Sequence, residues 1–283
     1  MKFNLCLVKP EGYVHSDAFW ELAELLAYSL RDLGHDAYIS INEFGKDFCN
    51  IVFGGHLLSE SSTAALPPST IIFNTEQLYL KDHSWNRRIF ELGRRLRVWD
   101  YSARNIERLT SEGCGGAALV QIGYHRRLER ITPQKNRDID VLFYGSANPR
   151  RRKVFKALRE RGFNVRNLFG IYGAQRDEYI SRSKLVQNMH RHNAQIFEVV
   201  RVHYLINNRV PVVCERNPGT EIDDWWGELV RGVAYEELAD RCAEVLADPA
   251  SGEQLATGAL ERLRQRPQKK ITADLLRQCE LQG

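Results

Sequence analysis

In the second half of the sequence, an apolar run ends at a glycine, and a cluster of cationic residues follows a few positions later. The run Val141–Tyr144 precedes Gly145 and Ser146, and three arginines and a lysine, Arg150 to Lys153, open the next segment. Glycine lets backbone approach a ligand closely, and the guanidinium group matches phosphate oxygens two at a time. Because cations at a helix N-terminus oppose the helix dipole, their accumulation indicates an anion nearby. We therefore predict a phosphate-binding turn with Arg152 as a ligand; the alternative is a tight turn and a solvated basic helix.

A second set of polar side chains brackets the next apolar strand. Lys184 begins this strand, and Asn188, His190 and His192 follow at its end. In open parallel sheets, ligands bind outside the carboxyl ends of the strands. We predict that Lys184, Asn188 and His190 bind the same anionic ligand, although a lone histidine is more often a loop residue with a satisfied hydrogen bond.

A carboxylate and a guanidinium group then fall three residues apart on one helix. Glu198 and Arg201 can share a face there, and an exposed ion pair would contribute only a few tenths of a kcal/mol. Beside the same strand ends, the pair could instead bind ribose hydroxyls and phosphate. We predict the second role, with Arg201 on the phosphate.

Polar residues also end each strand in the first half, where they would line the opposite wall of a cleft. The candidates for a general base are His15, Glu76 and Asp100. Each has a structural alternative, since Asp100 could be a turn residue and Ser102 could cap the following helix at 103 to 112.

The segment Trp85 to Arg97 places apolar residues on one face and arginines on the others. A buried stripe with a solvated basic face explains the pattern best. A peripheral contact with a membrane surface, or with nucleic acid, is the alternative.

Alternating strand and helix signals must position these residues, and they predict an α/β protein with two Rossmann-like domains and parallel sheets. The first domain spans 1–130 and the second 138–265, separated by a polar stretch. A C-terminal helix within 266–283 would pack back on the first domain. Ser16 is expected to cap the first helix and Gly34 to end it. The expected strands lie near 2–8, 36–41, 49–53, 70–74, 97–100, 118–122, 139–143, 163–168, 184–188, 210–214 and 230–233.

Composition narrows the class of protein. The chain has 283 residues, 43% hydrophobic and 27% charged, which suits two folded domains. A formal charge of +4 is mild for a dedicated nucleic-acid binder. Six scattered cysteines without a CxxC pair predict buried free thiols and no metal site. The N-terminus lacks a signal-peptide pattern, so a cytoplasmic protein is expected, with peripheral membrane contact as an alternative.

Taken together, residues 139–215 resemble the donor-binding half of the group 1 GT-B glycosyltransferases, which have two Rossmann domains and use nucleotide sugars. The likeness is carried by Phe143 to Ser146, by Lys184 to His190, and by Glu198-x-x-Arg201 through Val213. A weaker likeness extends through Thr75 to Gln77 and Val98 to Ser102. Many retaining members carry two glutamates eight residues apart; here Tyr204 stands where the second, which binds ribose, would fall.

The resemblance implies a transferase that takes a nucleotide sugar as donor and a glycan, lipid-linked or other hydroxyl as acceptor. The donor site would comprise Gly145, Ser146, Arg152, Lys184, Asn188, His190, Glu198, Arg201 and Tyr204. No cofactor or metal is expected, because arginine and lysine would neutralise the leaving diphosphate. The alternatives are a glycosyltransferase acting on modified nucleic acid, a non-catalytic nucleotide-sugar-binding protein, and a sugar-nucleotide epimerase.

Overall fold

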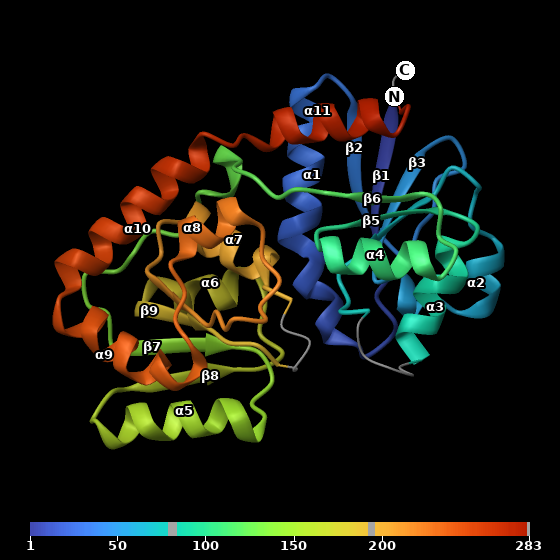
Figure 1. The fold of residues 1–283 in the computed structure, drawn as a ribbon. Helices are drawn as coiled ribbons and strands as arrows, with labels where there is room; N and C mark the ends of the chain where they lie inside the picture. Colours follow the sequence, from blue (N-terminus) through green and yellow to red (C-terminus); the bar gives the residue numbers. More distant parts are fainter. Residues whose placement is uncertain (79–83, 192–195, 282–283) are drawn as a thin grey trace. The chain divides into compact units, whose positions relative to one another are not determined.

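Apolar runs in the first part of the chain form a six-stranded parallel sheet in the computed structural model, which describes residues 1–78, 84–191 and 196–281 (Figure 1). The strand order is β2-β1-β3-β4-β5-β6. The strands are β1 (Lys2–Leu7), β2 (Asp36–Ile41), β3 (Cys49–Phe53), β4 (Ile71–Asn74), β5 (Arg97–Asp100) and β6 (Ala117–Leu119). Strands β3 and β4 are buried throughout, as expected for central strands with both faces covered.

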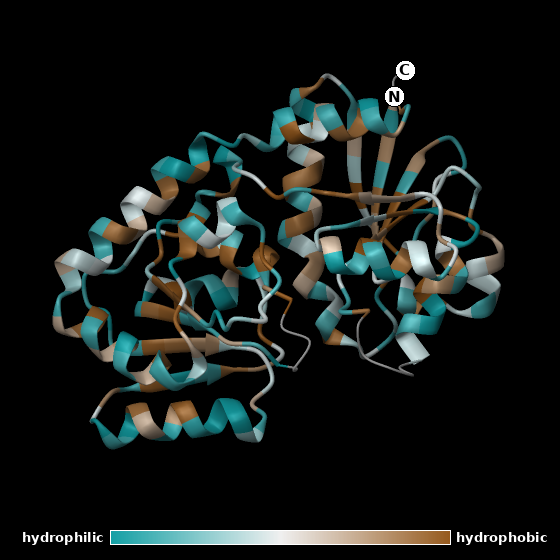
Figure 2. Ribbon diagram, viewed as in Figure 1, coloured by the Kyte–Doolittle hydropathy of each residue, from teal (hydrophilic) through white to brown (hydrophobic). Residues whose placement is uncertain are grey.

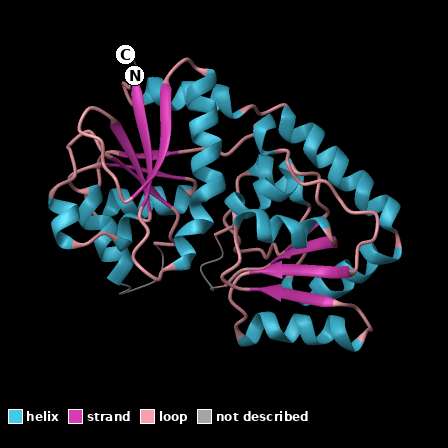
Figure 3. Ribbon diagram, turned by 180° about the vertical axis from the view of Figure 1, so that it is seen from behind, coloured by secondary structure: helices cyan, strands magenta, loops and turns pink. Residues whose placement is uncertain are grey.

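Helices connect these strands and cover the sheet (Figure 3). They are the 3-10 helices η1 (Val14–Phe19) and η2 (Gly55–Leu57), with α1 (Trp20–Asp32), α2 (Glu60–Ala64), α3 (Ser84–Gly93) and α4 (Ala103–Ser111). Gly34 ends the α1 segment with a positive φ, as predicted. Ser16 does not cap α1: it lies inside η1, and its hydroxyl donates to the Val8 carbonyl oxygen over 2.6 Å. Ser102 does cap α4, because its Oγ accepts from the Asn105 N–H.

The last helix, α11 (Gln268–Gln278), belongs to the same structural unit as the first sheet. It contacts α1, where Ser29 Oγ and Thr272 Oγ1 lie 2.8 Å apart. Gln268 Oε1 accepts from the Gly123 N–H over 2.7 Å. By compactness the chain divides into Met1–His125 with Arg266–Gly283, hereafter the first unit, and Arg126–Gln265, the second unit.

The second unit is built on a four-stranded parallel sheet of order β10-β9-β7-β8. Its strands are β7 (Ile139–Tyr144), β8 (Val165–Leu168), β9 (Ser183–Asn188) and β10 (Val212–Cys214). Its helices are η3 (Arg126–Leu128), α5 (Pro149–Glu160), α6 (Gly173–Ser181), α7 (Val199–Asn207), α8 (Asp224–Val230), η4 (Tyr235–Glu237), α9 (Leu238–Ala247) and α10 (Pro249–Arg264).

The strand predicted near 230–233 is wrong. Asp223 caps α8 by accepting from the Trp226 N–H over 2.8 Å, so the segment starts as a helix and runs to Val230. Arg231 then takes a left-handed conformation with φ 44, which is incompatible with an extended strand. Val233 pairs beside the sheet through an isolated bridge to Glu215.

Each sheet carries an apolar core, visible as brown strands in Figure 2. Phe3, Phe53, Phe73 and Trp99 are fully buried in the first unit, and Phe143 and Phe155 in the second. The predicted α/β fold class with parallel sheets is confirmed. All six cysteines lie within the described residues, and each is buried and free, as expected from their spacing.

Candidate functional site

A glycine turn stands at the carboxyl end of β7, the central strand after which the phosphate-binding turn was predicted. Gly145 has φ +141, and a Cβ there would lie 3.3 Å from Phe143 Cε1 and 3.5 Å from Arg201 Nη2. The backbone can adopt this conformation because glycine has no side chain. Ser146 follows, and its carbonyl oxygen accepts from Arg151 Nη1 over 3.0 Å.

The end of β9 and the start of α7 bring four of the predicted donor-site residues together. Glu198 is the N-cap residue of α7, and its Oε2 accepts from Asn188 Nδ2 over 3.0 Å. His190 Nδ1 lies 3.2 Å from Glu198 Oε2, and His190 Nε2 lies 3.2 Å from Thr220 Oγ1. Arg201 Nη1 donates to Asn188 Oδ1 over 3.1 Å. Asn188 therefore links the carboxylate to the guanidinium group.

This arrangement keeps Glu198 ionised. Burial alone would raise the pKa of its carboxyl, but the hydrogen bond and charge of His190, the charge of Arg201 and the Asn188 amide lower it to about 2. The cluster thus presents a fixed negative charge on one side of Asn188 and a fixed cation on the other. Arg201 also stacks on Tyr144, whose ring centroid lies 5.3 Å from its Cζ.

A buried ion pair that the sequence did not single out holds the same strand ends in place. Glu215 follows β10, is fully buried, and accepts from Arg150 Nη1 over 2.7 Å and also from Arg150 Nη2. The same carboxylate accepts from the His190 N–H over 3.0 Å and from Asn217 Nδ2 over 2.6 Å. Tyr235 packs against the Arg150 guanidinium with its centroid 3.7 Å away. A carboxylate directly after an apolar strand was the signal available in the sequence.

The arginine run at the start of α5 divides into three different environments. Arg151 is buried, donates to the Ser146 and Met189 carbonyl oxygens, and its Nε has no partner within the described residues. Burial, with the nearby charge of Arg201, lowers the pKa of Arg151 to about 10. Arg152, the predicted phosphate ligand, is exposed and donates to the Ala147 carbonyl oxygen. The structure turns Arg151, not Arg152, toward the strand ends.

Lys184 is also separated from the cluster. It lies near the amino end of β9, is exposed, and its Nζ is 2.7 Å from Asp140 Oδ1. Asn188 ends the same strand, so the two residues lie at opposite ends of β9. His192 lies outside the described residues.

Tyr204 lies one turn of α7 beyond Arg201, in a network of its own. Its hydroxyl donates to Asp177 Oδ2 over 2.6 Å and accepts from Arg130 Nε over 2.8 Å. Burial, followed by the charge of Asp177, raises the pKa of the Tyr204 hydroxyl well above its usual range. Arg176 packs on the same ring at 4.7 Å. Because this hydroxyl is already engaged on both sides, Tyr204 supports α7 instead of offering a free group to a ribose.

In the first unit, Asp100 is fully buried and accepts hydrogen bonds from neighbouring neutral groups. Its Oδ2 accepts from Asn74 Nδ2 over 2.6 Å and from Asn105 Nδ2 over 2.9 Å, and its Oδ1 accepts from the Ser102 N–H over 2.8 Å. Asn105 also donates to the Glu76 carbonyl oxygen over 2.8 Å. Asp100 therefore organises the loop after β4, and this placement argues against its role as a base.

The other two base candidates remain at the carboxyl edge of the first sheet. Glu76 Oε1 lies 3.8 Å from His56 Nε2, and the Glu76 side chain is 27% exposed, which leaves it accessible. The His56 ring packs on Trp85 at a centroid distance of 4.5 Å. His15 lies in η1 and makes an edge contact with Tyr13.

The arginine-rich segment forms α3 only as far as Gly93, beside which Cys114 Sγ leaves no room for a Cβ. Ile89 and Leu92 are buried, as expected for the apolar stripe. Arg88 donates to the Leu58 carbonyl oxygen and Arg94 to that of Glu112, so part of the basic face already has partners.

Across 1–78, 84–191 and 196–281, no group of three or more histidine, cysteine, aspartate or glutamate side chains is arranged to hold a metal ion. Over the same part of the chain, every helix is too short or too polar to span a membrane.

Comparisons with known proteins give distant relatives and a clear fold likeness. No family model matches the chain. Uncharacterized protein L137 of Acanthamoeba polyphaga mimivirus is 26% identical over 210 residues, covering 70% of this chain and 26% of that protein. Uncharacterized protein L140 of the same virus is 24% identical over 258 residues, covering 85% of this chain and 82% of that protein. The chain thus spans about a quarter of the first relative and most of the second.

Among solved structures, the chain is similar to WaaG, described as a glycosyltransferase involved in lipopolysaccharide biosynthesis. The TM-score is 0.59 at 11% identity, over 96% of this chain and 98% of that one. TarM gives a TM-score of 0.55 at 11% identity, over 91% of this chain and 58% of that one. At such low identity the likeness concerns the fold.

Proposed function

The chain has the two-domain fold of the GT-B glycosyltransferases, and from that premise we propose that it transfers a sugar from a nucleotide-diphosphate donor to an acceptor hydroxyl. The fold expected from the sequence resemblance is confirmed, and the reaction is inferred from the site. The donor would bind at the carboxyl ends of the second sheet, where open parallel sheets bind ligands.

The observation that carries the proposal is the position of Arg201 beside Gly145. A Cβ at Gly145 would lie 3.5 Å from Arg201 Nη2, so a phosphate oxygen placed against this glycine backbone would meet the guanidinium group. Asn188 fixes that group by accepting from Nη1. A fixed cation at the point where charge develops stabilises a leaving diphosphate without reorganisation.

The helix that follows the turn adds to this electrostatic field. The side chain of Asn148 caps α5 by accepting from the Arg151 N–H over 2.9 Å, and Pro149 occupies the first turn. A helix N-terminus carries partial positive charge that suits phosphate. Arg150 is neutralised by Glu215, so Arg151 and Arg201 supply the positive potential.

The transfer breaks the bond between the sugar C1 and the leaving phosphate oxygen and forms a bond from C1 to the acceptor oxygen. The diphosphate leaves with its charge neutralised by Arg201, in the role that a metal ion has in other transferases. If configuration is inverted, the acceptor proton passes to Glu76, with His56 beside it. If configuration is retained, the same cations serve the leaving group and no dedicated base is needed.

Binding to nucleotide sugars tests this proposal directly. Thermal unfolding should be followed with UDP, GDP, CDP, ADP and dTDP and their sugars, because a ligand at 100 times its dissociation constant adds ~2.7 kcal/mol. Arg201→Ala should weaken binding of the best donor by about 10- to 100-fold, as a lost charged hydrogen bond costs about 1.5–3 kcal/mol.

Arg152→Ala is the matched control, since this exposed arginine at the start of α5 donates to the Ala147 carbonyl oxygen, and the variant should bind as the wild type does. Donor affinity unchanged by Arg201→Ala would remove Arg201 from the site. Tight binding without transfer to any glycan, lipid-linked or nucleic-acid acceptor would favour a non-catalytic binding protein.

A further inference from the structure

The outer edge of the second sheet is open along part of β10. On its inner side, the Pro211 carbonyl oxygen accepts from the Val186 N–H over 2.9 Å. On its outer side, the Cys214 carbonyl oxygen accepts from the Val233 N–H over 3.0 Å. Because alternate residues of a parallel strand bond to opposite sides, the N–H and C=O of Val212 point outward with those of Cys214. Within the described residues, Val212 forms no hydrogen bond on that side.

The open edge has a local cause in the chain that would otherwise cover it. The segment after α8 pairs with the chain of β10 through an isolated bridge at Val233, and Arg231, with φ 44, cannot extend alongside the strand. A strand edge that presents unpaired backbone groups is a template for pairing with another chain.

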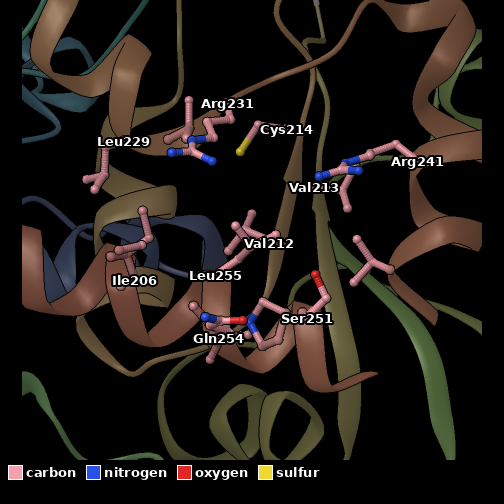
Figure 4. A pocket seen from close by; sticks show the side chains of 18 of the residues that line it. Ile206, Val212, Val213, Cys214, Leu229, Arg231, Arg241, Ser251, Gln254 and Leu255 are labelled. Atoms are coloured by element: carbon pink, nitrogen blue, oxygen red, sulfur yellow. The ribbon is translucent and has the colours of Figure 1, made fainter. Parts of the chain in front are cut away.

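A cavity of about 600 Å³ lies against this edge, between β10 and helices α8, α9 and α10 (Figure 4). Small residues of α10 form one wall, and a Cβ at Gly258 would meet nothing within 4 Å. Apolar side chains from three helices project into the space: Ile206, Leu229 and Leu255. Leu255 is 40% exposed. The cavity therefore has room and apolar surface beside backbone groups that need partners.

The charge around this cavity is mainly positive. Its lining includes Arg231, Arg241 and Arg262 against one carboxylate, Glu228. Arg262 pairs with Glu228, and Arg241 pairs with Glu244 over 2.9 Å. Arg231 is exposed and forms no ion pair within the described part of the chain. A ligand that carries acidic groups complements this rim.

We propose that this groove binds an extended segment of a partner protein, in which acidic and apolar side chains alternate, as an added strand on the outer edge of β10. Backbone hydrogen bonds to Val212 would give affinity, and alternate side chains would face the apolar wall. Acidic residues would meet Arg231. This surface is separate from the donor site, so the inference stands or falls independently of the transfer reaction.

Two peptide sets test the strand geometry on the unaltered protein. The probe is a fluorescein-labelled peptide with alternating glutamate and valine, titrated by fluorescence anisotropy. Two counterparts carry N-methyl groups, one on every valine and the other on every glutamate. Since alternate N–H groups of a strand point to opposite sides, one counterpart should lose about tenfold in affinity and the other should keep it.

Variants of the protein test whether Val212 and Arg231 contribute to peptide binding. Val212→Pro removes only the outward N–H, because the bonds to β9 come from neighbouring residues, and it should weaken binding about tenfold. Val212→Ala keeps that N–H and should bind like the wild type. Arg231→Gly should lower affinity about fivefold while raising the melting temperature, because glycine favours the left-handed conformation at this position.

Several results would overturn the proposal. One is no binding of the alternating peptide at millimolar concentration. Another is equal affinity of both N-methylated peptides, which would indicate a groove for an amphiphile instead of a strand. A third is unchanged affinity of a folded Val212→Pro protein. Should Val212→Pro fail to fold, the peptide pair and Arg231→Gly still decide the question.

Discussion

The carboxyl edges of the two sheets stabilise a buried carboxylate in contrasting ways. In the second unit, arginines lie beside both carboxylates: the charge of Arg201 acts on Glu198, and Arg150 pairs with Glu215. In the first unit, Asp100 accepts hydrogen bonds from neutral donors, among them two amides and a backbone N–H. Charged partners leave fixed cations at the sheet edge, whereas neutral donors fix a loop without adding charge. The contrast suits one edge to an anion and the other to a proton acceptor.

The largest expected effect is on kcat, and it tests whether Glu76 in the first unit accepts the proton. Glu76→Gln should lower kcat by about 100- to 10,000-fold if the reaction inverts configuration, since that is the range for a general base. Stability should stay close to that of the wild type, because the Glu76 side chain is partly exposed. Steady-state kinetics and thermal unfolding measure the two quantities.

His15→Gln is the comparison variant, because His15 is the other accessible candidate on the same edge. Loss of turnover in His15→Gln with full activity in Glu76→Gln would reassign the base. Full activity in both would point to a retaining reaction.

The buried ion pair of the second unit should dominate its stability. Glu215→Gln leaves Arg150 without its charge partner, and breaking a buried pair costs about 3–5 kcal/mol. We expect a loss of about 3 kcal/mol, the lower end of this range, in urea unfolding, because the Arg150 side chain is 29% exposed. Glu228→Gln, which breaks an exposed pair with Arg262, should cost less than about 1 kcal/mol. Similar losses in the two variants would contradict the distinction between a buried and a surface pair.

The depressed pKa of Glu198 predicts a pH dependence of stability. Its folded-state pKa of about 2 lies below its ordinary value of 4.5, so ionised Glu198 stabilises the fold above pH 4.5. This contribution is lost as the pH falls from 4.5 to about 2, by roughly 2 kcal/mol between neutral pH and about pH 3. Guanidinium unfolding at both pH values should show a smaller pH-dependent loss in Glu198→Gln. An equal loss in variant and wild type would refute the assignment.

The smallest expected effect is a change in stability at two equivalent helix ends, one in each unit. Helix α1 is followed by Gly34 with φ +86, whereas α7 is followed by Arg209 with φ 54. Glycine adopts this conformation without strain, so Arg209→Gly should stabilise the protein by about 0.5–1 kcal/mol. Gly34→Ala should destabilise it by a similar amount. Melting temperatures that move in the same direction for both variants would show that another interaction sets these helix ends.

Local patterns in the sequence predicted the strands well but could not resolve which side chains face the site. Apolar runs located β1 to β10 within a few residues, because strands buried on both faces are continuous in sequence. The structure turns Arg151, and not the predicted Arg152, toward the strand ends, because each helical residue turns about 100° further and the phase depends on how α5 packs. Lys184 was assigned to the site although the carboxyl end of its strand lies several residues later.

Long-range partners account for the remaining differences. Asp100 and Tyr204 have chemistry suited to a site, yet their partners, Asn74 and Asp177, are 26 and 27 residues away. The Glu215–Arg150 pair spans 65 residues, so the carboxylate after β10 could not indicate its partner. The predicted strand at 230–233 failed because a capping aspartate and one left-handed residue outweighed its β-branched composition.

The buried cysteine thiols offer a way to measure how often each unit opens transiently. Burial raises the pKa of Cys49 to about 11 and that of Cys214 and Cys242 further still, so none is a ready nucleophile in the closed state. Alkylation can then proceed only when the surrounding layer separates. The alkylation rates of Cys49 and Cys242, measured by mass spectrometry, would report the frequency of transient opening in the first and the second unit without an engineered probe.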